Sequence, residues 1–252
     1  EIVRCWAAEK MRIQENKDAG LSAGQMPHMN LMFLGNTGTG KTTLAKLAAG
    51  YMKAAGILPS GRFEYMAAGS LTGTGGQPAA KIRAAARRAA GGVLIIDDFH
   101  KFDRAGHDGN TAQEAMAALA SVVNAHREDL CIILIGHKDQ ADKVLSYGAG
   151  EGNRFPNLIV FQDYEVETLF LILEKCLEQS GIKMEEDAKT CVKKVIAHYK
   201  QDAKDSFDNA GFIIDKLLPM LNQKRLKREK TDTCIRQDVT DAFPETFRYE
   251  ET

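Results

Sequence analysis

The sequence predicts an α/β fold in which a parallel five-stranded sheet is flanked by helices and followed by a small all-α domain. Short, unbroken hydrophobic runs alternate with helical patterns through the first part of the chain, as expected for strands buried on both faces of a parallel sheet. After Asp163 these runs disappear and only helical patterns remain. We therefore expect two domains, residues 1–163 and 164–252.

The first helix is expected over residues 2–19, because Ile2, Trp6, Met11 and Ile13 supply its hydrophobic face and Gly20 ends it. Hydrophobic runs without alternation predict the strands at residues 30–34, 62–66, 92–96, 130–135 and 158–161. Helices are expected between them at residues 42–55, 79–90 and 111–126. The second domain should hold helices near residues 165–180, 185–202, 208–222 and 235–243.

Composition excludes several classes of protein. The 252 residues carry 33 Lys and Arg against 34 Asp and Glu, and a net charge of −1 argues against a nucleic-acid coat or a polybasic membrane binder. No apolar run approaches the roughly 18 residues of a membrane span. Five scattered cysteines without a C-x-x-C pair exclude a disulfide framework and predict an intracellular, reducing compartment. Because Glu1 already lies in a helical pattern, we expect the chain to be a piece of a longer protein.

A phosphate-binding loop is predicted at residues 35–42, whose sequence GNTGTGKT matches G-x-x-x-x-G-K-[ST] between a strand and a helix. Its glycines allow a tight turn whose N–H groups surround an anion. Lys41 can reach the β- and γ-phosphates, and the Thr42 hydroxyl can ligate Mg²⁺. The predicted nucleotide-binding residues are Asn36, Thr37, Gly38, Thr39, Gly40, Lys41, Thr42 and Thr43.

A second element of the predicted site is the pair of carboxylates Asp97 and Asp98, which follow the hydrophobic run 93–96. A buried strand that ends in an acid is typical of enzymes with a phosphate-binding loop. Asp97 is expected to hold the metal or its water shell. Asp98 stands where a general base could orient an attacking water.

With these motifs in place, the chain resembles the AAA+ ATPases, and within them the CbbX-type branch of red-type Rubisco activases and stage V sporulation protein K relatives. The likeness covers nearly the whole chain and is carried by HMNLMFLGNTGTGKTTLAKLAAGYMKAAG, GGVLIIDDFHKF, CIILIGHKDQAD and FQDY. It implies ATP and Mg²⁺ bound between an α/β core and a helical lid. It also implies assembly with other AAA+ modules, in a ring or in tandem, and ATP hydrolysis coupled to remodelling of a protein partner.

The resemblance also implies three catalytic residues. Asp98 would be the second acid of Walker B, but the family usually has Glu there, so its carboxylate is about 1.5 Å short and hydrolysis is expected to be slow. His137, with Lys138 as second choice, would be sensor 1, which contacts the γ-phosphate or the water. Arg154 would be an arginine finger that stabilises the phosphoryl group in a neighbouring subunit.

Two departures from the family pattern keep an alternative open. Gly211 stands where the family has the sensor 2 arginine, and Lys216, about 140° around the helix, is a poor replacement. The loop 71–77 lacks the aromatic residue expected to grip a substrate chain. The alternative is a hydrolysis-impaired ATP-binding module with a structural or regulatory role in a larger assembly.

Two other nucleotide-binding classes are weaker candidates. A GTP switch would carry Asn-Lys-x-Asp after a strand, and residues 137–140 do not fit that pattern. A nucleotide kinase would carry a base-binding and arginine-rich lid set, and only the helix with Arg83, Arg87 and Arg88 offers anything similar.

Overall fold

The computed structural model describes residues 1–71, 77–102, 110–138, 141, 154–228 and 232–247. By its contacts the chain divides into two compact units. The first unit comprises residues 1–35 and 41–161, and the second comprises residues 36–40 and 162–252. Among the described residues, no helix combines the length and the hydrophobicity needed to cross a bilayer.

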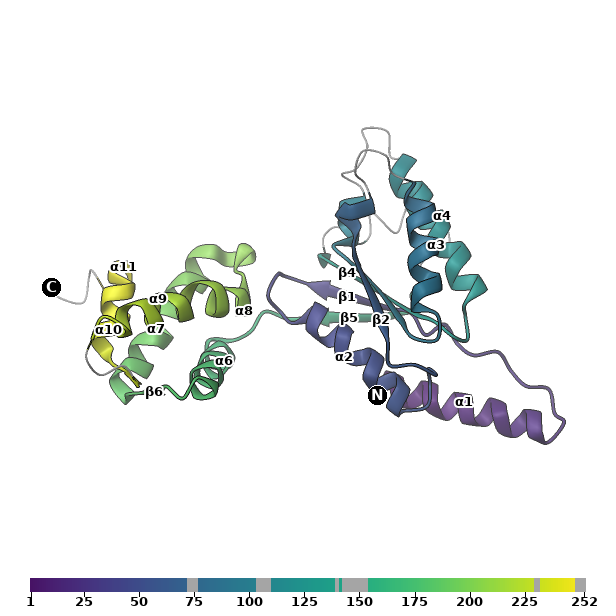
Figure 1. The fold of residues 1–252 in the computed structure, drawn as a ribbon, viewed down its shortest axis with the longest axis horizontal. Coiled ribbons are helices and arrows are strands. Elements are labelled where there is room, and N and C mark those ends of the chain that lie inside the picture. The colour runs from purple at the N-terminus through teal and green to yellow at the C-terminus, as the bar shows by residue number, and fades with distance from the viewer. Residues whose placement is uncertain (72–76, 103–109, 139–140, 142–153, 229–231, 248–252) are drawn as a thin grey trace. The chain divides into compact units, whose positions relative to one another are not determined.

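The first unit is built on a five-stranded parallel sheet, which confirms the predicted fold class (Figure 1). The strand order is β2-β3-β4-β1-β5. The strands are β1 (Leu31–Gly35), β2 (Phe63–Ala67), β3 (Val93–Asp97), β4 (Cys131–Gly136) and β5 (Asn157–Phe161). The helices are α1 (Ile2–Asp18), α2 (Lys41–Ala54), α3 (Pro78–Ala89) and α4 (Asn110–Ala125), with short 3₁₀ turns at Ala68–Leu71 and Phe99–Phe102. The bounds of the five strands and four helices each lie within two residues of the expected ones, whereas the 3₁₀ turns were not expected.

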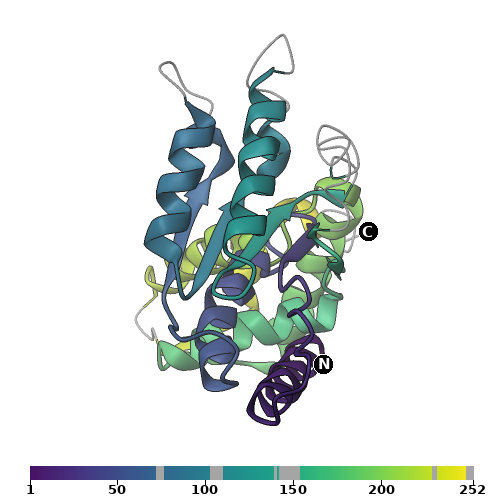
Figure 2. The same cartoon turned by 90° about the vertical axis from the view of Figure 1, so that its right-hand side faces the viewer.

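Helices cover both faces of this sheet, because its inner strands are hydrophobic on both sides. In β3, Leu94 and Ile96 pack with residues of α3 and α4, whereas Val93 and Ile95 belong to a second cluster with α1 and α2. Figure 2 shows α3 and α4 side by side on their face of the sheet. The two clusters anchor the inner strands, whose carboxyl ends therefore stand at fixed positions.

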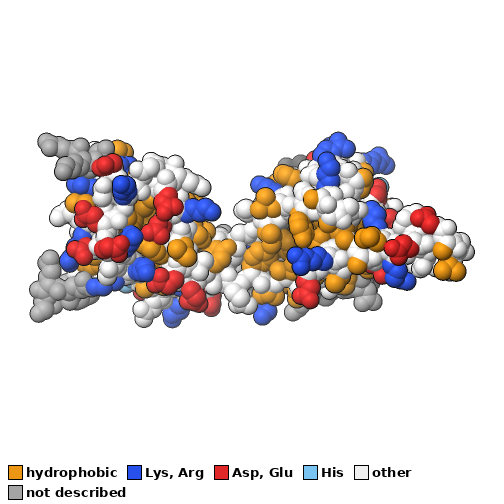
Figure 3. Space-filling view, turned by 90° about the horizontal axis from the view of Figure 1, so that it is seen from below, with side chains coloured by type: hydrophobic (Ala, Val, Ile, Leu, Met, Phe, Trp, Pro, Cys, Tyr) orange, Lys and Arg blue, Asp and Glu red, His pale blue; other side chains and the backbone are white. Residues whose placement is uncertain are grey.

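One surface of the first unit stays hydrophobic. Leu44, Leu47 and Tyr51 on α2 are exposed, as are Leu158 and Val160 on the edge strand β5. Figure 3 views the molecule from the side of α2, where hydrophobic side chains gather on this unit.

The second unit is mainly helical. Its elements are α6 (Val166–Gln179), β6 (Lys183–Met184), α7 (Glu186–Ala203), a 3₁₀ turn (Lys204–Ser206), α8 (Asn209–Gly211), a π-helix (Phe212–Leu217), α9 (Leu218–Arg225), β7 (Thr233–Cys234), α10 (Arg236–Ala242) and α11 (Pro244–Phe247). The expectation that strands disappear after Asp163 is wrong in one detail, because β6 and β7 form a short parallel pair. Strands of two residues leave no readable hydrophobic pattern. The π-helix ends two residues before Pro219, which lacks the backbone N–H that a regular α-helix would use.

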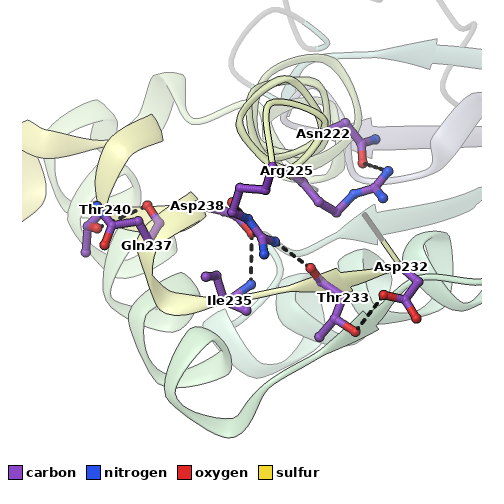
Figure 4. Close-up of polar contacts among 9 residues, drawn as sticks. Asn222, Arg225, Asp232, Thr233, Ile235, Gln237, Asp238 and Thr240 are labelled. Atoms are coloured by element: carbon purple, nitrogen blue, oxygen red, sulfur yellow. Dashed lines mark hydrogen bonds and ion pairs between the residues drawn. The ribbon is translucent and has the colours of Figure 1, made fainter. Parts of the chain in front are cut away.

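An ion pair between the buried carboxylate of Asp238 and the partly exposed Arg228 lies near β7 in the second unit (Figure 4). Asp238 is 2% exposed and accepts hydrogen bonds from Arg228 Nε at 2.7 Å and Arg228 Nη2 at 2.6 Å. The Ile235 N–H donates to the same carboxylate at 2.9 Å, and Arg228 also donates to the Thr233 carbonyl at 2.7 Å. Because one carboxylate serves the loop, the strand and α10 together, it fixes the end of this unit.

Candidate functional site

The site predicted around Lys41 and Asp97 is assembled at the carboxyl edge of the sheet. β1 and β3 flank β4, and in a parallel sheet all three end at the same edge. There the Thr42 hydroxyl donates a hydrogen bond of 2.7 Å to Asp97 Oδ2. Lys41, at the start of α2, is buried. Residues 55 positions apart in the sequence are thus brought into contact, as the two motifs predict.

Both oxygens of Asp97 are held in place. The Asp98 N–H donates to Oδ1 at 2.9 Å, and the Tyr65 hydroxyl donates to Oδ2 at 3.2 Å. Tyr65 lies on β2, which pairs with β3, and its contact escaped sequence reasoning because only sheet pairing reveals it. Burial, followed by the charge of Asp97, raises the pKa of Tyr65, so the hydroxyl stays a donor. A threonine hydroxyl beside a fixed carboxylate supplies the hard oxygen donors that suit Mg²⁺.

Asp98 adopts an unusual backbone conformation and is ion-paired. Its φ is +55°, in the left-handed region that non-glycine residues rarely occupy. Lys101 Nζ donates to Asp98 Oδ2 at 2.5 Å. Strain of this kind concentrates at functional sites. The predicted general base therefore shares its carboxylate with a lysine that sequence reasoning did not single out.

His137 follows β4 at the same edge and contacts a second histidine. The ring centroids of His137 and His100 lie 5.1 Å apart in an edge-to-face arrangement. Gly136 permits the close packing before it, since a Cβ there would lie 2.5 Å from the Phe99 ring. The proposed sensor 1 position is thus occupied by a histidine held against buried His100. Lys138, the second choice, is exposed.

The first half of the phosphate loop belongs to the second unit. Gly38 and Gly40 have φ values of +71° and +86°, as a loop wrapped around an anion requires. Asn36 Nδ2 donates to both oxygens of Asp163, at 3.1 and 3.0 Å. Thr39, which is 1% exposed, donates to the Asn36 carbonyl at 2.8 Å.

Thr37 completes this half through its carbonyl, which accepts a hydrogen bond of 3.1 Å from Asn209. The last predicted loop residue, Thr43, lies on α2 and has an exposed side chain.

Arg154 lies at the opposite edge of the sheet. It precedes β5, and its carbonyl accepts a hydrogen bond of 2.9 Å from Asn30, which precedes β1. Asn30 also accepts the Ile132 N–H at 2.9 Å, so this edge gathers the amino ends of β1, β4 and β5. Five residues of strand span about 16 Å. The arginine therefore stands a strand length away from the Thr42 and Asp97 contact of its own chain.

A carboxylate lies beside Gly211, where the family resemblance predicts the sensor 2 position. A Cβ on Gly211 would lie 2.1 Å from Asp208 Oδ2, so the Asp208 side chain occupies the space that a side chain at residue 211 would need. Lys216 Nζ lies 4.1 Å from the centre of the Tyr199 ring, a cation–π contact inside the second unit. Most of the expected pore loop, residues 72–76, falls outside the described residues.

Two family profiles match successive parts of the chain. The profile of the ATPase family associated with various cellular activities (AAA) matches residues 31–162, and that of the AAA lid domain matches residues 165–245. The Thermotoga maritima RuvB Holliday junction branch migration motor has a similar fold, with a TM-score of 0.61 and 15% identity over 94% of this chain and 67% of that one.

Curated relatives are about 30% identical. The CfxQ homolog of Trieres chinensis is 31% identical over 96% of this chain and 86% of its own length. The chloroplastic cbbX homolog of Guillardia theta is 32% identical over 75% of this chain and 50% of its own. The chloroplastic ribulose bisphosphate carboxylase/oxygenase activase of Cyanidioschyzon merolae is 33% identical over 75% of this chain and 60% of its own. The match thus spans only about half to three fifths of two of these relatives. With both profiles in chain order and a relative matched over most of its length, the chain belongs to the AAA ATPase family and is similar to its CbbX and CfxQ members.

Proposed function

We propose that the chain binds ATP with Mg²⁺ and hydrolyses it to drive the remodelling of a protein partner, in an assembly with other AAA+ modules. The observation that carries the proposal is the 2.7 Å hydrogen bond between Thr42 of the phosphate loop and Asp97 of the acidic motif. Thr42 and Asp97 would hold the magnesium ion, which supplies charge stabilisation to the phosphates when bound. Lys41 and the N–H groups of residues 36–42 would bind the phosphate chain.

In the proposed reaction, a water oxygen bonds to the γ-phosphorus and the bond to the β,γ-bridging oxygen breaks, leaving ADP and phosphate. Asp98 would orient the water and accept a proton from it as a general base. To do so, its carboxylate must leave the ion pair with Lys101. His137 would contact the γ-phosphate or the water. Arg154 would act on a neighbouring module, because its position at the amino edge of the sheet keeps it from the site of its own chain.

The class of partner is proposed from the relatives. The Cyanidioschyzon merolae relative is named as an activase of ribulose bisphosphate carboxylase/oxygenase. For this chain we propose a folded protein as the partner and a reducing compartment as its location. We also propose the domain division at residues 163 and 164. The comparisons do not support the hydrolysis-impaired alternative.

Steady-state phosphate release tests this proposal. The chain is assayed with Mg²⁺ and ATP at several protein concentrations, beside Lys41→Ala and the control Lys53→Ala, an exposed lysine in the last turn of the same helix. We expect release that Lys41→Ala abolishes and Lys53→Ala retains. Absence of release at every concentration, or release by Lys41→Ala at the wild-type rate, would refute it.

A further inference from the structure

The phosphate loop is held in place by hydrogen bonds to its backbone carbonyl groups. Three successive carbonyls of the loop accept hydrogen bonds from other residues of the second unit. These bonds are Asn209 Nδ2 to the Thr37 carbonyl (3.1 Å), the Ala210 N–H to the Gly38 carbonyl (3.1 Å) and the Tyr164 hydroxyl to the Thr39 carbonyl (2.9 Å). The donors come from α8, labelled in Figure 1, and from the segment before α6.

Asn209 is the centre of this arrangement. Its side chain is fully buried, and its φ of +39° lies in the left-handed region, which asparagine tolerates better than most residues. Its Oδ1 accepts the Tyr164 N–H at 2.9 Å, and because a backbone N–H can only donate, this bond fixes which way the amide faces. Its Nδ2 therefore faces acceptors: the Thr37 carbonyl, Asp163 Oδ1 at 2.9 Å and the Phe207 carbonyl at 3.1 Å.

The direction of these bonds matters for an anion. The C=O and N–H of a peptide unit point in opposite directions, so a loop whose carbonyls are tied on one side presents its N–H groups on the other. A free carbonyl turned inward would repel a polyphosphate. We infer that Asn209 is a positioning residue for the phosphates, which holds the Thr37 carbonyl outward so that the N–H groups of the loop face the polyphosphate chain. This inference rests on the proposed binding of ATP.

Asp163 links Asn209 to the phosphate loop. Its carboxylate accepts hydrogen bonds from both Asn36 and Asn209, so an amide of the loop and the amide that holds the loop share one acceptor. Replacing Asn209 by aspartate keeps the shape but exchanges the donor for an acceptor. A carboxylate would then face the Thr37 and Phe207 carbonyls and the carboxylate of Asp163. The loop can relieve these repulsions only by giving up its bond from residue 209.

The test measures binding of magnesium tripolyphosphate and of Mg-ATP by calorimetry, using the whole chain. Tripolyphosphate isolates the phosphate contacts from those of the base. Asn209→Asp should weaken tripolyphosphate binding by about tenfold or more. The matched control Asn222→Asp lies in α9, where its side chain contacts Arg225 and not the loop, and should bind as the wild type does. Adding Asp163→Asn to Asn209→Asp should restore part of the loss, which a general weakening of the fold would not show.

Thermal melting followed by circular dichroism reports whether each variant is folded. If Asn209→Asp does not fold, Tyr164→Phe decides, since it removes only the hydroxyl that donates to Thr39 and should still weaken tripolyphosphate binding severalfold. A folded Asn209→Asp, or Tyr164→Phe in its place, that binds tripolyphosphate like the wild type would overturn the inference. A wild-type chain that binds neither ligand would overturn the proposed function itself.

Discussion

The contact between the phosphate loop and residue 208 can be tested by replacing Gly38 with alanine. Gly38 has a φ of +71°, and a Cβ added there would lie 2.1 Å from the Asp208 carbonyl oxygen and 2.9 Å from the Gly211 nitrogen. Both atoms belong to backbone, which does not yield as the end of a side chain does. Real Cβ atoms essentially never come within 3.0 Å of a nonbonded atom of a residue elsewhere in the chain, so the alanine must push the segment at least 0.9 Å away (3.0 minus 2.1).

The expected magnitude has two parts. An L-residue in the left-handed conformation costs about 1–2 kcal/mol, and forcing extra volume into a packed contact costs about 1–3 kcal/mol. Gly38→Ala should therefore lower the free energy of unfolding by about 2–5 kcal/mol. Gly20 provides the matched control, because it has the same φ of +71° and nothing lies within 4 Å of its added Cβ. Gly20→Ala should show the conformational part alone.

Urea denaturation followed by circular dichroism, without nucleotide, measures the difference. Hydrogen exchange supplies a local readout, since the Ala210 N–H donates to the Gly38 carbonyl and should lose protection in Gly38→Ala but not in Gly20→Ala. Equal destabilisation by the two variants, with Ala210 still protected, would show that the loop and residue 208 do not touch in solution.

Three further predictions concern the lid, the pH dependence and the hydrolysis rate. Asp238→Ala should lower the free energy of unfolding by about 2–3 kcal/mol, since it strands the Arg228 guanidinium, whereas Asp241→Ala on the same helix should change little in the same urea titration. Burial and two nearby arginines lower the pKa of His28, so the folded chain favours the neutral ring. The contribution of His28 to the free energy of unfolding is therefore full above about pH 6.5, the pKa of an unperturbed histidine, and is lost as the pH falls below that value. The unfolding free energy of His28→Asn should therefore fall less between pH 7 and pH 5, and an unchanged slope would contradict this. Asp98→Glu should raise steady-state phosphate release by about tenfold or more, because the added methylene brings the carboxylate to the water; a slower variant would exclude the shortened carboxylate as the limit.

The fold and one half of the site were predictable because their signals are local. Unbroken hydrophobic runs identify buried strands. The phosphate loop and the pair of aspartates each follow directly after such a run. Parallel pairing of β3, β4 and β1 then brings Thr42 to Asp97 without further information. The sheet alone thus accounts for the part of the site that the sequence predicts.

The other half depends on contacts that leave no pattern. Asn209 acts on a backbone carbonyl, and any residue supplies a carbonyl, so no sequence spacing marks the partner. Asp163 was only a boundary marker in the sequence, although its carboxylate joins two amides of the site. The ion pair of Asp98 with Lys101 lies within one turn, but lysines near surface acids are too common to signal a role.

The place of Arg154 at the amino edge of the sheet has a consequence for mixtures of defective chains. Under the proposed function, Lys41→Ala chains lack a working site and Arg154→Ala chains lack a working finger, so neither turns over ATP alone. In an equal, random mixture, about a quarter of the interfaces would join an intact site to an intact finger. Two inactive preparations should then regain about a quarter of the wild-type turnover on mixing, and dilution should abolish what they regain.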